Sequence, residues 1–196
     1  MASDGSSESF PVQVKILVAG GFGVGKTTFV ASVSEIEPLT TEETLTTASV
    51  GTDSVAGVEN KATTTVAMDF GRISMPDKNL VLYLFGTPGQ ERFWFMWDEL
   101  SRGALGAVVL ADTRRLRDCF SAVEFFERRD IKFIVALNEF DDSHWYSDVE
   151  VRQALALAPH VPLVRCDARK TRSASEVLIA LLESVLATFS VAGTRP

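Results

Sequence analysis

The sequence is poor in the residues that build disulfide frameworks and zinc sites. It has two cysteines, Cys119 and Cys166, and two histidines, and their spacing matches no zinc-binding motif. Both cysteines stand in apolar segments, so we expect buried thiols in a reducing compartment. The pattern excludes a secreted domain held by disulfides and a domain stabilised by zinc.

Long apolar runs are absent as well. No stretch of about 18 apolar residues is available to span a membrane, and residues 1–10 lack the apolar core of a signal peptide. Residue 2 is Ala2 rather than the glycine that myristoylation needs, and residues 193–196 form no prenylation box. We therefore expect a cytoplasmic protein without membrane insertion, which a partner would have to carry to a membrane.

The sequence also lacks an excess of positive charge. Its formal net charge is −7, and an acidic protein is repelled by phosphate backbones. We therefore expect no direct binding to nucleic acid. The 196 residues, 46% of them hydrophobic, suffice for one domain with a sizeable core. We expect a disordered tail over residues 1–10 and one small GTPase-like domain over residues 11–196.

Strand-like apolar runs alternate with helical segments along the rest of the chain. The predicted strands are residues 12–19, 65–74, 79–85, 104–111, 131–137 and 161–166. Helices are predicted at residues 26–34, 115–129 and 149–157, and from a Ser173-x-x-Glu176 capping box onward, while residues 35–64 read as a long functional loop. The alternation predicts an α/β fold of three layers, a six-stranded, mostly parallel sheet with helices on both faces.

A glycine-rich motif follows the first predicted strand. Residues 20–27 read G-G-F-G-V-G-K-T and match the phosphate-binding pattern G-x-x-x-x-G-K-[ST]. Its glycines let backbone N–H groups point at phosphate oxygens, and the following helix adds its positive dipole end. Lys26 would reach the β- and γ-phosphates, and Thr27 would ligate Mg²⁺. The candidate nucleotide-binding residues here are Gly21, Phe22, Gly23, Val24, Gly25, Lys26, Thr27 and the neighbouring Thr28.

Two later loops are candidates for binding the base. Asn138 and Asp141 form an Asn-x-x-Asp pattern after residues 131–137. The Asp141 carboxylate would accept from the N1–H and 2-amino groups of guanine, while the Asn138 amide would fix the loop and meet the O6/N7 edge. After the last predicted strand come Asp167, Ala168 and Arg169, and the N–H of Ala168 would donate to guanine O6. Asn-x-x-Asp also occurs in ordinary loops, so ATP stays open as an alternative to GTP.

The segment after residues 79–85 reads G-T-P-G-Q-E-R-F-W-F-M-W. With the glycine-rich motif, it resembles the Ras-superfamily small GTPases, in particular the bacterial branch of MglA-like and actinobacterial conservon GTPases. The resemblance covers residues 12–190 and implies a P-loop NTPase fold. It implies that Gly89 senses the γ-phosphate and that Gln90, acting with Lys26, orients the attacking water. It also implies that Thr65 ligates Mg²⁺, although Thr63 and Thr64 compete with it and a plain strand start explains the run equally well.

Three positions depart from the pattern of that superfamily. Gly86 stands where an Asp normally holds Mg²⁺ through water, and Asp53 is one candidate replacement, although a solvated loop acid is the plainer interpretation. Phe22 occupies a position that is Gly in fast members, which predicts slow hydrolysis and hindered entry of an arginine from a partner. Glu139 replaces the Lys whose stem packs along the base, which should weaken guanine binding.

Two further groups of side chains have open interpretations. Residues 93–97 form an aromatic run that either binds a partner or packs beneath a switch helix, with at least one Trp outward. Five arginines either supply a catalytic arginine in cis or are ordinary surface residues: Arg92, Arg102, Arg114, Arg115 and Arg117.

Taken together, these patterns predict a GTP-binding molecular switch with slow GTP hydrolysis, using GTP/GDP and Mg²⁺. The resemblance implies a roadblock-type regulator as partner and, in conservon clusters, a sensor kinase or a pentapeptide-repeat protein. One alternative is a nucleotide-gated binding module with negligible intrinsic turnover, and another is an ATP-using P-loop NTPase. A P-loop kinase is disfavoured because the sequence shows no Arg-rich lid and has Gln90 after Gly89.

Overall fold

The structure is a computed structural model that describes residues 10–46, 63–89 and 95–192. In chain order its elements are β1 (Val12–Ala19), α1 (Lys26–Val33), β2 (Leu39–Thr46), β3 (Thr63–Met75), the 3₁₀ helix η1 (Pro76–Lys78), β4 (Leu80–Gly86), α2 (Phe95–Ser101), β5 (Ala104–Ala111), the 3₁₀ helix η3 (Thr113–Cys119), α3 (Phe120–Arg128), β6 (Phe133–Asn138), α4 (Asp148–Ala154), β7 (Leu163–Cys166) and α5 (Thr171–Ala192). The tail predicted for residues 1–10 lies outside the described part except for Phe10.

The strands of the described part form one sheet in the order β2-β3-β4-β1-β5-β6-β7. The β2–β3 and β3–β4 pairs are antiparallel, and the other pairs are parallel. The predicted α/β class, with its mostly parallel sheet, is confirmed, and all six predicted strands are present. A further strand, β2, comes from the stretch that we predicted to be a long loop. Its Thr-rich run is suited to a pleated strand and pairs with β3, and this corrects the expectation for residues 39–46.

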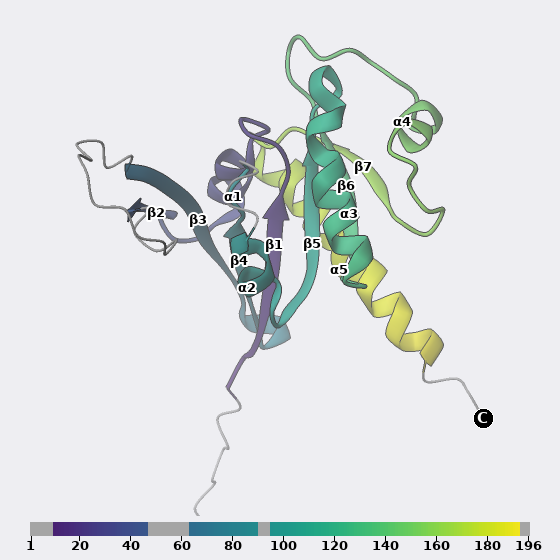
Figure 1. The fold of residues 1–196 in the computed structure, drawn as a ribbon. Coiled ribbons are helices and arrows are strands. Elements are labelled where there is room, and N and C mark those ends of the chain that lie inside the picture. Colours follow the sequence, from purple (N-terminus) through teal and green to yellow (C-terminus); the bar gives the residue numbers. More distant parts are fainter. Residues whose placement is uncertain (1–9, 47–62, 90–94, 193–196) are drawn as a thin grey trace, which may run out of the picture.

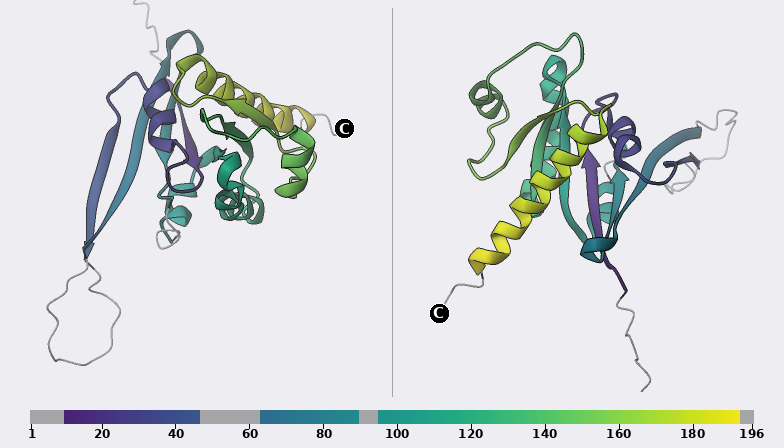
Figure 2. Two further views of the ribbon diagram at one scale, coloured as in Figure 1. Left: turned by 90° about the horizontal axis from the view of Figure 1, so that it is seen from above. Right: turned by 180° about the vertical axis from the view of Figure 1, so that it is seen from behind.

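Helices cover both faces of the sheet, as predicted. Figures 1 and 2 show α1 and α5 on one face, with α2 and α3 on the other. The alternation of side chains along β1 serves both layers. Ile16 and Val18 face the apolar core beneath α1 and α5, whereas Leu17 and Ala19 face the core beneath α2, α3 and α4. None of the helices in the described residues is long and apolar enough to cross a bilayer.

The start of the helix predicted for residues 115–129 is corrected by the structure. The segment begins as the 3₁₀ helix η3, in which Arg115 has non-helical backbone angles, and the α-helix starts only at Phe120. The side chain of Asp112 accepts a hydrogen bond from the N–H of Arg114 and caps η3. This capped 3₁₀ turn holds the loop after β5 against the glycine-rich loop, as described below.

Two other helix starts also differ from the prediction. Ser173 lies inside α5 rather than capping it, because its hydroxyl accepts from the N–H of Asp167 over 3.0 Å, so the predicted capping box is wrong. The helix predicted for residues 149–157 is α4, Asp148–Ala154, and it begins with a reciprocal capping box between Ser147 and Glu150.

The loops that were predicted to bind the nucleotide lie at one edge of the sheet. The parallel strands β1, β4, β5, β6 and β7 all end there, so the loops that follow them are neighbours in space (Figure 1). The carboxyl ends of strands are where open α/β sheets bind ligands. On the antiparallel side, β2 and the first part of β3 extend beyond the body of the domain (Figure 2).

Candidate nucleotide-binding site

The glycine-rich loop turns sharply between β1 and α1. Gly20, Gly23 and Gly25 all have positive φ angles, which non-glycine residues rarely adopt. A Cβ atom at Gly25 would lie 2.7 Å from Nδ2 of Asn138, so the residue must be glycine for the Asn138 side chain to reach the loop. The predicted strand, loop and helix are therefore present, with α1 beginning at Lys26.

The Lys26 side chain folds back across this loop. Its Nζ donates to the carbonyl oxygens of Gly20 at 2.9 Å and Gly21 at 2.7 Å. Burial lowers the pKa of Lys26 from 10.5 to about 8, although the carboxylate of Asp69 opposes that shift. A Cβ atom on Gly89 would lie 2.6 Å from Lys26 Nζ, so the segment after β4 lies against the lysine. A bound phosphate would supply the negative charge that favours charged Lys26.

A carboxylate from β3 meets the first turn of α1. The Thr27 hydroxyl donates to Oδ2 of Asp69 over 2.8 Å, and Asp69 is 6% exposed. Asp69 stands opposite Gly86 in the β3–β4 ladder. The sequence pattern does not mark Asp69 and leads instead to Asp53, which lies outside the described residues. The signal that finds Asp69 is the strand register, because the one acid of β3 faces the one position on β4 that lacks a side chain.

Asn138 ties the glycine-rich loop to the loop after β7. Its Nδ2 donates to the carbonyl oxygen of Val24 over 2.9 Å, and its Oδ1 accepts from the N–H of Ala168 over 2.9 Å. The amide therefore fixes the loops, as the Asn-x-x-Asp pattern suggested. The N–H of Ala168 was expected to face guanine O6, but in this structure it donates to Asn138.

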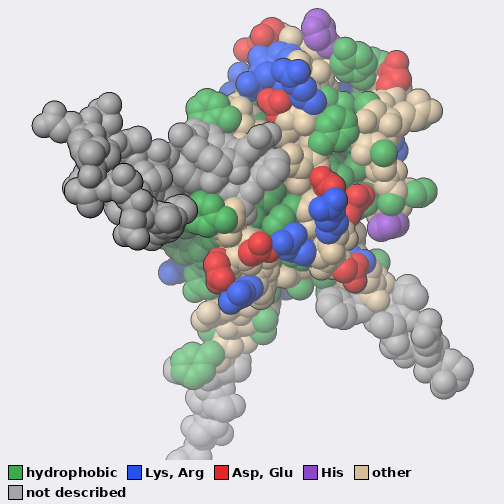
Figure 3. Space-filling model, viewed as in Figure 1, with side chains coloured by type: hydrophobic (Ala, Val, Ile, Leu, Met, Phe, Trp, Pro, Cys, Tyr) green, Lys and Arg blue, Asp and Glu red, His purple; other side chains and the backbone are tan. Residues whose placement is uncertain are grey.

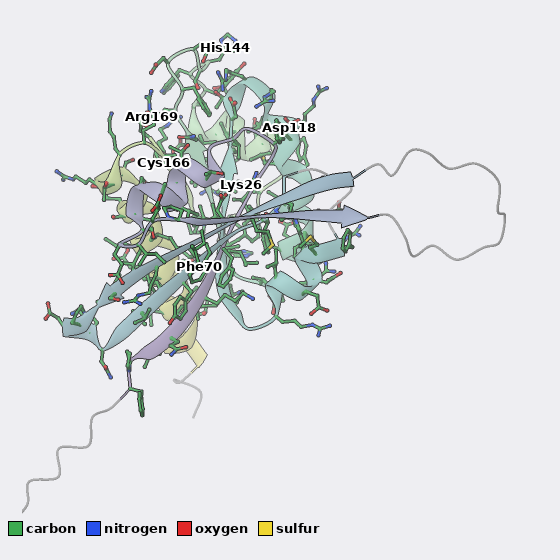
Figure 4. The ribbon with its side chains drawn as sticks, turned by 90° about the vertical axis from the view of Figure 1, so that its left-hand side faces the viewer. Lys26, Phe70, Asp118, His144, Cys166 and Arg169 are labelled. Carbon is green, nitrogen blue, oxygen red and sulfur yellow. The ribbon has the colours of Figure 1, made fainter. Side chains whose placement is uncertain are left out.

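The rest of the predicted base loop is held by ion pairs. The Arg169 guanidinium contacts Asp141 at 3.2 Å and Asp167 at 2.9 Å. Hydrogen bonds from Arg169 hold the pKa of Asp167 well below its usual range. Glu139 pairs with Arg165 at 3.7 Å. Asp167 thus anchors Arg169 beside Asp141, while Glu139 is engaged by a different arginine. Figure 4 shows Lys26, Cys166 and Arg169 at the same end of the molecule.

The segment after β5 contacts the glycine-rich loop. Arg115 Nη2 donates to the carbonyl oxygen of Phe22 over 3.2 Å, while the Phe22 side chain is 68% exposed. Of the other predicted arginines, Arg114 pairs with Asp112 and Asp142, Arg102 pairs with Glu99, Arg117 lies on the surface beside Asp118, and Arg92 lies outside the described residues. Arg115 is therefore the one among these described arginines that contacts the glycine-rich loop.

The aromatic run divides between the core and the surface. Trp97 is 2% exposed, donates from Nε1 to the carbonyl oxygen of Pro88 over 3.1 Å and stacks on Phe126. Phe95 points outward and is 64% exposed. Trp97 thus connects α2 to the segment that follows β4. The predicted catalytic Gln90 lies outside the described residues, together with Phe93 and Trp94.

Metal ligands in this site come from few protein atoms. In the described part of the chain, no group of three or more His, Cys, Asp or Glu side chains is placed to hold a metal ion. Thr27 and Asp69 supply oxygen atoms, which suit Mg²⁺. Thr65 stands opposite Thr44 in the β2–β3 ladder, but its side chain lies outside the described part, as do those of Thr63 and Thr64. A metal here would take further ligands from phosphate and water.

Two other groups of side chains lie apart from this chemistry. Cys119 and Cys166 are both free and buried, and burial raises the pKa of each thiol to about 12, so both remain protonated. On the face shown in Figure 3, Lys and Arg side chains lie beside Asp and Glu side chains. The absence of direct nucleic-acid binding stays a prediction.

Comparison with known proteins gives both a family and a fold. A family model described as conserved hypothetical ATP binding protein matches residues 18–188. The chain is 29% identical to uncharacterized protein MJ1339 of Methanocaldococcus jannaschii over 131 residues, covering 66% of this chain and 71% of that protein. It is 23% identical to the Ras-related protein SEC4 of Saccharomyces cerevisiae over 196 residues, covering 94% of this chain and 80% of that protein.

Solved structures with the same fold include the cytosolic domain of the T. maritima FeoB iron transporter in a GDP form. The match has a TM-score of 0.62 at 18% identity and covers 89% of this chain. The chain spans 64% of the length of that domain. At this identity the likeness shows the fold, which agrees with the architecture predicted from the sequence.

Proposed function

The chain belongs to the family of conserved hypothetical ATP-binding proteins, and from this premise we propose that its nucleotide is GTP and that it is a switch with slow GTP hydrolysis. The observation that carries the proposal is the Asn138 side chain. It bonds Val24 of the phosphate loop and Ala168 of the second base loop at once. Phosphate and base loops thereby form one continuous site, as a nucleoside triphosphate requires.

The choice of guanine rests on Asp141. Its carboxylate is exposed beside that site and is held by Arg169. A carboxylate accepts from the N1–H and 2-amino groups of guanine, whereas adenine presents an acceptor at its N1 position. A site built around such a pairing rejects a base that leaves the carboxylate unpaired. Relatives such as the GTP-binding protein ypt2 of Schizosaccharomyces pombe, 25% identical over 189 residues, support the same choice.

We propose that Arg169 packs against the base in place of the Lys that Glu139 replaces. Glu139 is engaged by Arg165, so it offers no apolar stem to the base. Arg169 follows Ala168 in the second base loop, and its guanidinium already lies beside Asp141. A planar guanidinium stacks well on an aromatic face. We assign Arg169 to the face of the guanine, with its contact to Asp141 broken or shared when the base enters.

Slow hydrolysis follows from Phe22. The exposed ring stands on the phosphate loop, and the N–H of Phe22 lies 2.9 Å from the place of a Cβ atom on Gly89. An arginine supplied by a partner would have to pass this ring to reach the γ-phosphate. Lys26 would hold the phosphates, and Gln90 would orient the attacking water.

The nucleotide state would be transmitted through the segment after β4. Gly89 touches both Lys26 and the phosphate loop, while Pro88 accepts the hydrogen bond of the buried Trp97. A γ-phosphate that draws in the N–H of Gly89 would therefore act on α2. Thr65 would report the same phosphate and Mg²⁺ from the β2–β3 side. Ordering of two segments by the γ-phosphate is how such domains switch.

The exposed Phe95 on α2 gives the partner proposal a location. We assign it to the surface that a roadblock-type regulator reads, with a sensor kinase or pentapeptide-repeat protein as further partners in a conservon-type cluster. Exposed aromatic side chains are enriched at the centres of interfaces. Such a partner would also account for recruitment of this chain from the cytoplasm to a membrane.

A second candidate function is a nucleotide-gated binding module with negligible turnover. It is favoured by the exposed Phe22 side chain on the phosphate loop. Both functions predict guanine-nucleotide binding, and they differ in phosphate release. Single-turnover release of phosphate from GTP over hours separates them, since the switch reaches completion without a partner and the module does not.

Switching itself is tested by hydrogen exchange. We expect residues 35–65 and 86–102 to exchange more slowly with a non-hydrolysable GTP analogue than with GDP, both with Mg²⁺. The core strand β5 (Ala104–Ala111), which lies outside those two segments, is the internal control and should not change. Equal exchange of the two segments in both nucleotide states would contradict the proposal.

A further inference from the structure

We infer that Asp69 supplies the carboxylate that holds Mg²⁺ in this site, so that the acid absent at position 86 has moved across the ladder from β4 to β3. The inference rests on the proposed nucleotide function. It assigns a role to a residue that the motif does not contain, and it explains why position 86 is glycine.

The register of the sheet places the two positions together. Asp69 on β3 is directly opposite Gly86 on β4, and the two strands are antiparallel. Directly opposite residues of an antiparallel pair project to the same face, with their Cβ atoms about 5 Å apart. A carboxylate on Asp69 therefore serves nearly the same region of the site as a carboxylate on residue 86.

The two positions also exclude one another. A Cβ atom on Gly86 would lie 2.8 Å from Oδ2 and 3.0 Å from Cβ of Asp69, so the Asp69 carboxylate fills the space in which a side chain at residue 86 would begin. Real Cβ atoms do not approach so closely. An acid on β4 and an acid on β3 are thus alternatives, and this chain has the second.

The carboxylate is aimed at the metal-binding residue of the phosphate loop. Oδ2 of Asp69 accepts the hydroxyl proton of Thr27 over 2.8 Å, which leaves the lone pairs of that hydroxyl for a cation. The pair offers only hard oxygen ligands, the kind that Mg²⁺ prefers. Asp69 would orient Thr27 and accept from water around the metal, and partners of this kind are worth about 10–100-fold in metal affinity.

The rival explanation is structural, in which Asp69 only caps the Thr27 hydroxyl. Asp69→Asn separates the two, because asparagine keeps an oxygen that accepts from Thr27 and loses the charge. The matched control is Asp77→Asn at the opposite end of β3, where Asp77 lies exposed in η1. The readout is the dissociation rate of fluorescent mant-GDP in excess Mg²⁺ and in EDTA, which does not depend on hydrolysis.

We expect EDTA to speed GDP release at least about tenfold from the wild type and from Asp77→Asn, and less than about twofold from Asp69→Asn. Asp69→Gly should lose the Mg²⁺ response, and the double variant Asp69→Gly/Gly86→Asp should regain most of it. The assignment of Asp69 to Mg²⁺ would be overturned if EDTA sped GDP release from Asp69→Asn and Asp69→Gly as much as from the wild type. If the wild-type protein bound no GDP, the proposed function itself would be wrong. If it bound GDP but the effect of EDTA did not depend on Asp69, only this inference would be wrong.

Discussion

The side chain of Asn138 donates to the carbonyl oxygen of Val24 over 2.9 Å. The bond joins the end of β6 to the phosphate loop across 114 residues of sequence. The same amide accepts from Ala168, so three loops share one buried side chain.

Replacing Asn138 by alanine should loosen all three loops. The buried carbonyl of Val24 and the buried N–H of Ala168 lose their partner, and unpaired buried polar groups cost about 1–3 kcal/mol. We expect Asn138→Ala to lower the free energy of unfolding by that amount in urea titrations and to weaken GDP binding. Stability within about 0.5 kcal/mol of the wild type would show that the bond does not hold the loops.

Asp141→Asn should change the preferred base. An amide donates to the oxygen that xanthine carries at C2, where guanine has an amino group, so we expect weaker GDP binding and measurable xanthosine diphosphate binding in competition titrations. Asp130→Asn is a matched control, because Asp130 lies exposed after α3 at the other end of the sheet. If GDP bound Asp141→Asn as tightly as the wild type, the assignment of Asp141 to the base would be wrong.

Phe22→Gly should speed GTP cleavage. Removing the exposed ring frees the surface of the phosphate loop where Gln90 and the attacking water would approach the γ-phosphate, so single-turnover hydrolysis should rise at least about tenfold, equivalent to about 1.4 kcal/mol of barrier. The conservative Phe22→Leu should stay slow. An unchanged rate in Phe22→Gly would refute the role given to the ring.

The lowered pKa of Lys26 predicts a pH dependence of stability without nucleotide. Its pKa falls from 10.5 to about 8 on folding because of burial, so between those values the unfolded chain binds more protons and stability rises with pH. Below pH 8 Lys26 is charged in both the folded and the unfolded protein, so the full free-energy cost of burying its charge destabilises the folded state. The unfolding free energy of the wild type, minus that of Lys26→Met, should therefore increase from pH 8 to 10.5, by an amount on the order of 3 kcal/mol. A constant difference would contradict the burial of a charged Lys26.

Trp97→Phe should destabilise the segment after β4. Phenylalanine keeps an aromatic ring against Phe126 but leaves the Pro88 carbonyl without its donor, which costs about 1–3 kcal/mol in a buried site. Trp145→Phe is the control, because that indole is 75% exposed, and it should change stability by less than about 0.5 kcal/mol. Equal melting temperatures for the two variants would mean that the Trp97 hydrogen bond contributes nothing.

Local patterns in the sequence were enough to predict the fold class and the phosphate loop. The apolar runs rich in β-branched residues form all the predicted strands, and the glycines form the predicted phosphate loop. β2 was not predicted because its Thr-rich sequence favours a strand no more than a loop. Its pairing with β3 decides that it forms a strand. The capping box predicted at Ser173 was wrong because of another contact that the local sequence does not show. The Ser173 hydroxyl accepts a hydrogen bond from the N–H of Asp167, six residues earlier.

Asp69 shows why part of the site was beyond the sequence. Nothing near it in the chain marks it as functional, and the motif directs attention to residue 86. Only the antiparallel register and the absent side chain of Gly86 bring its carboxylate to Thr27. The roles of Gln90 and Thr65 remain predictions from the family resemblance, because their side chains lie outside the described part.

The central claim is that a member of a family described as ATP-binding selects guanine. It is tested most directly by displacing mant-GDP with GTP, GDP, ATP and ADP in the presence of Mg²⁺. We expect GTP and GDP to compete at least about 100-fold better than ATP and ADP, since a site that hydrogen-bonds one base rejects a base that leaves its polar groups unpaired. Displacement by ATP as effective as displacement by GTP would contradict the account.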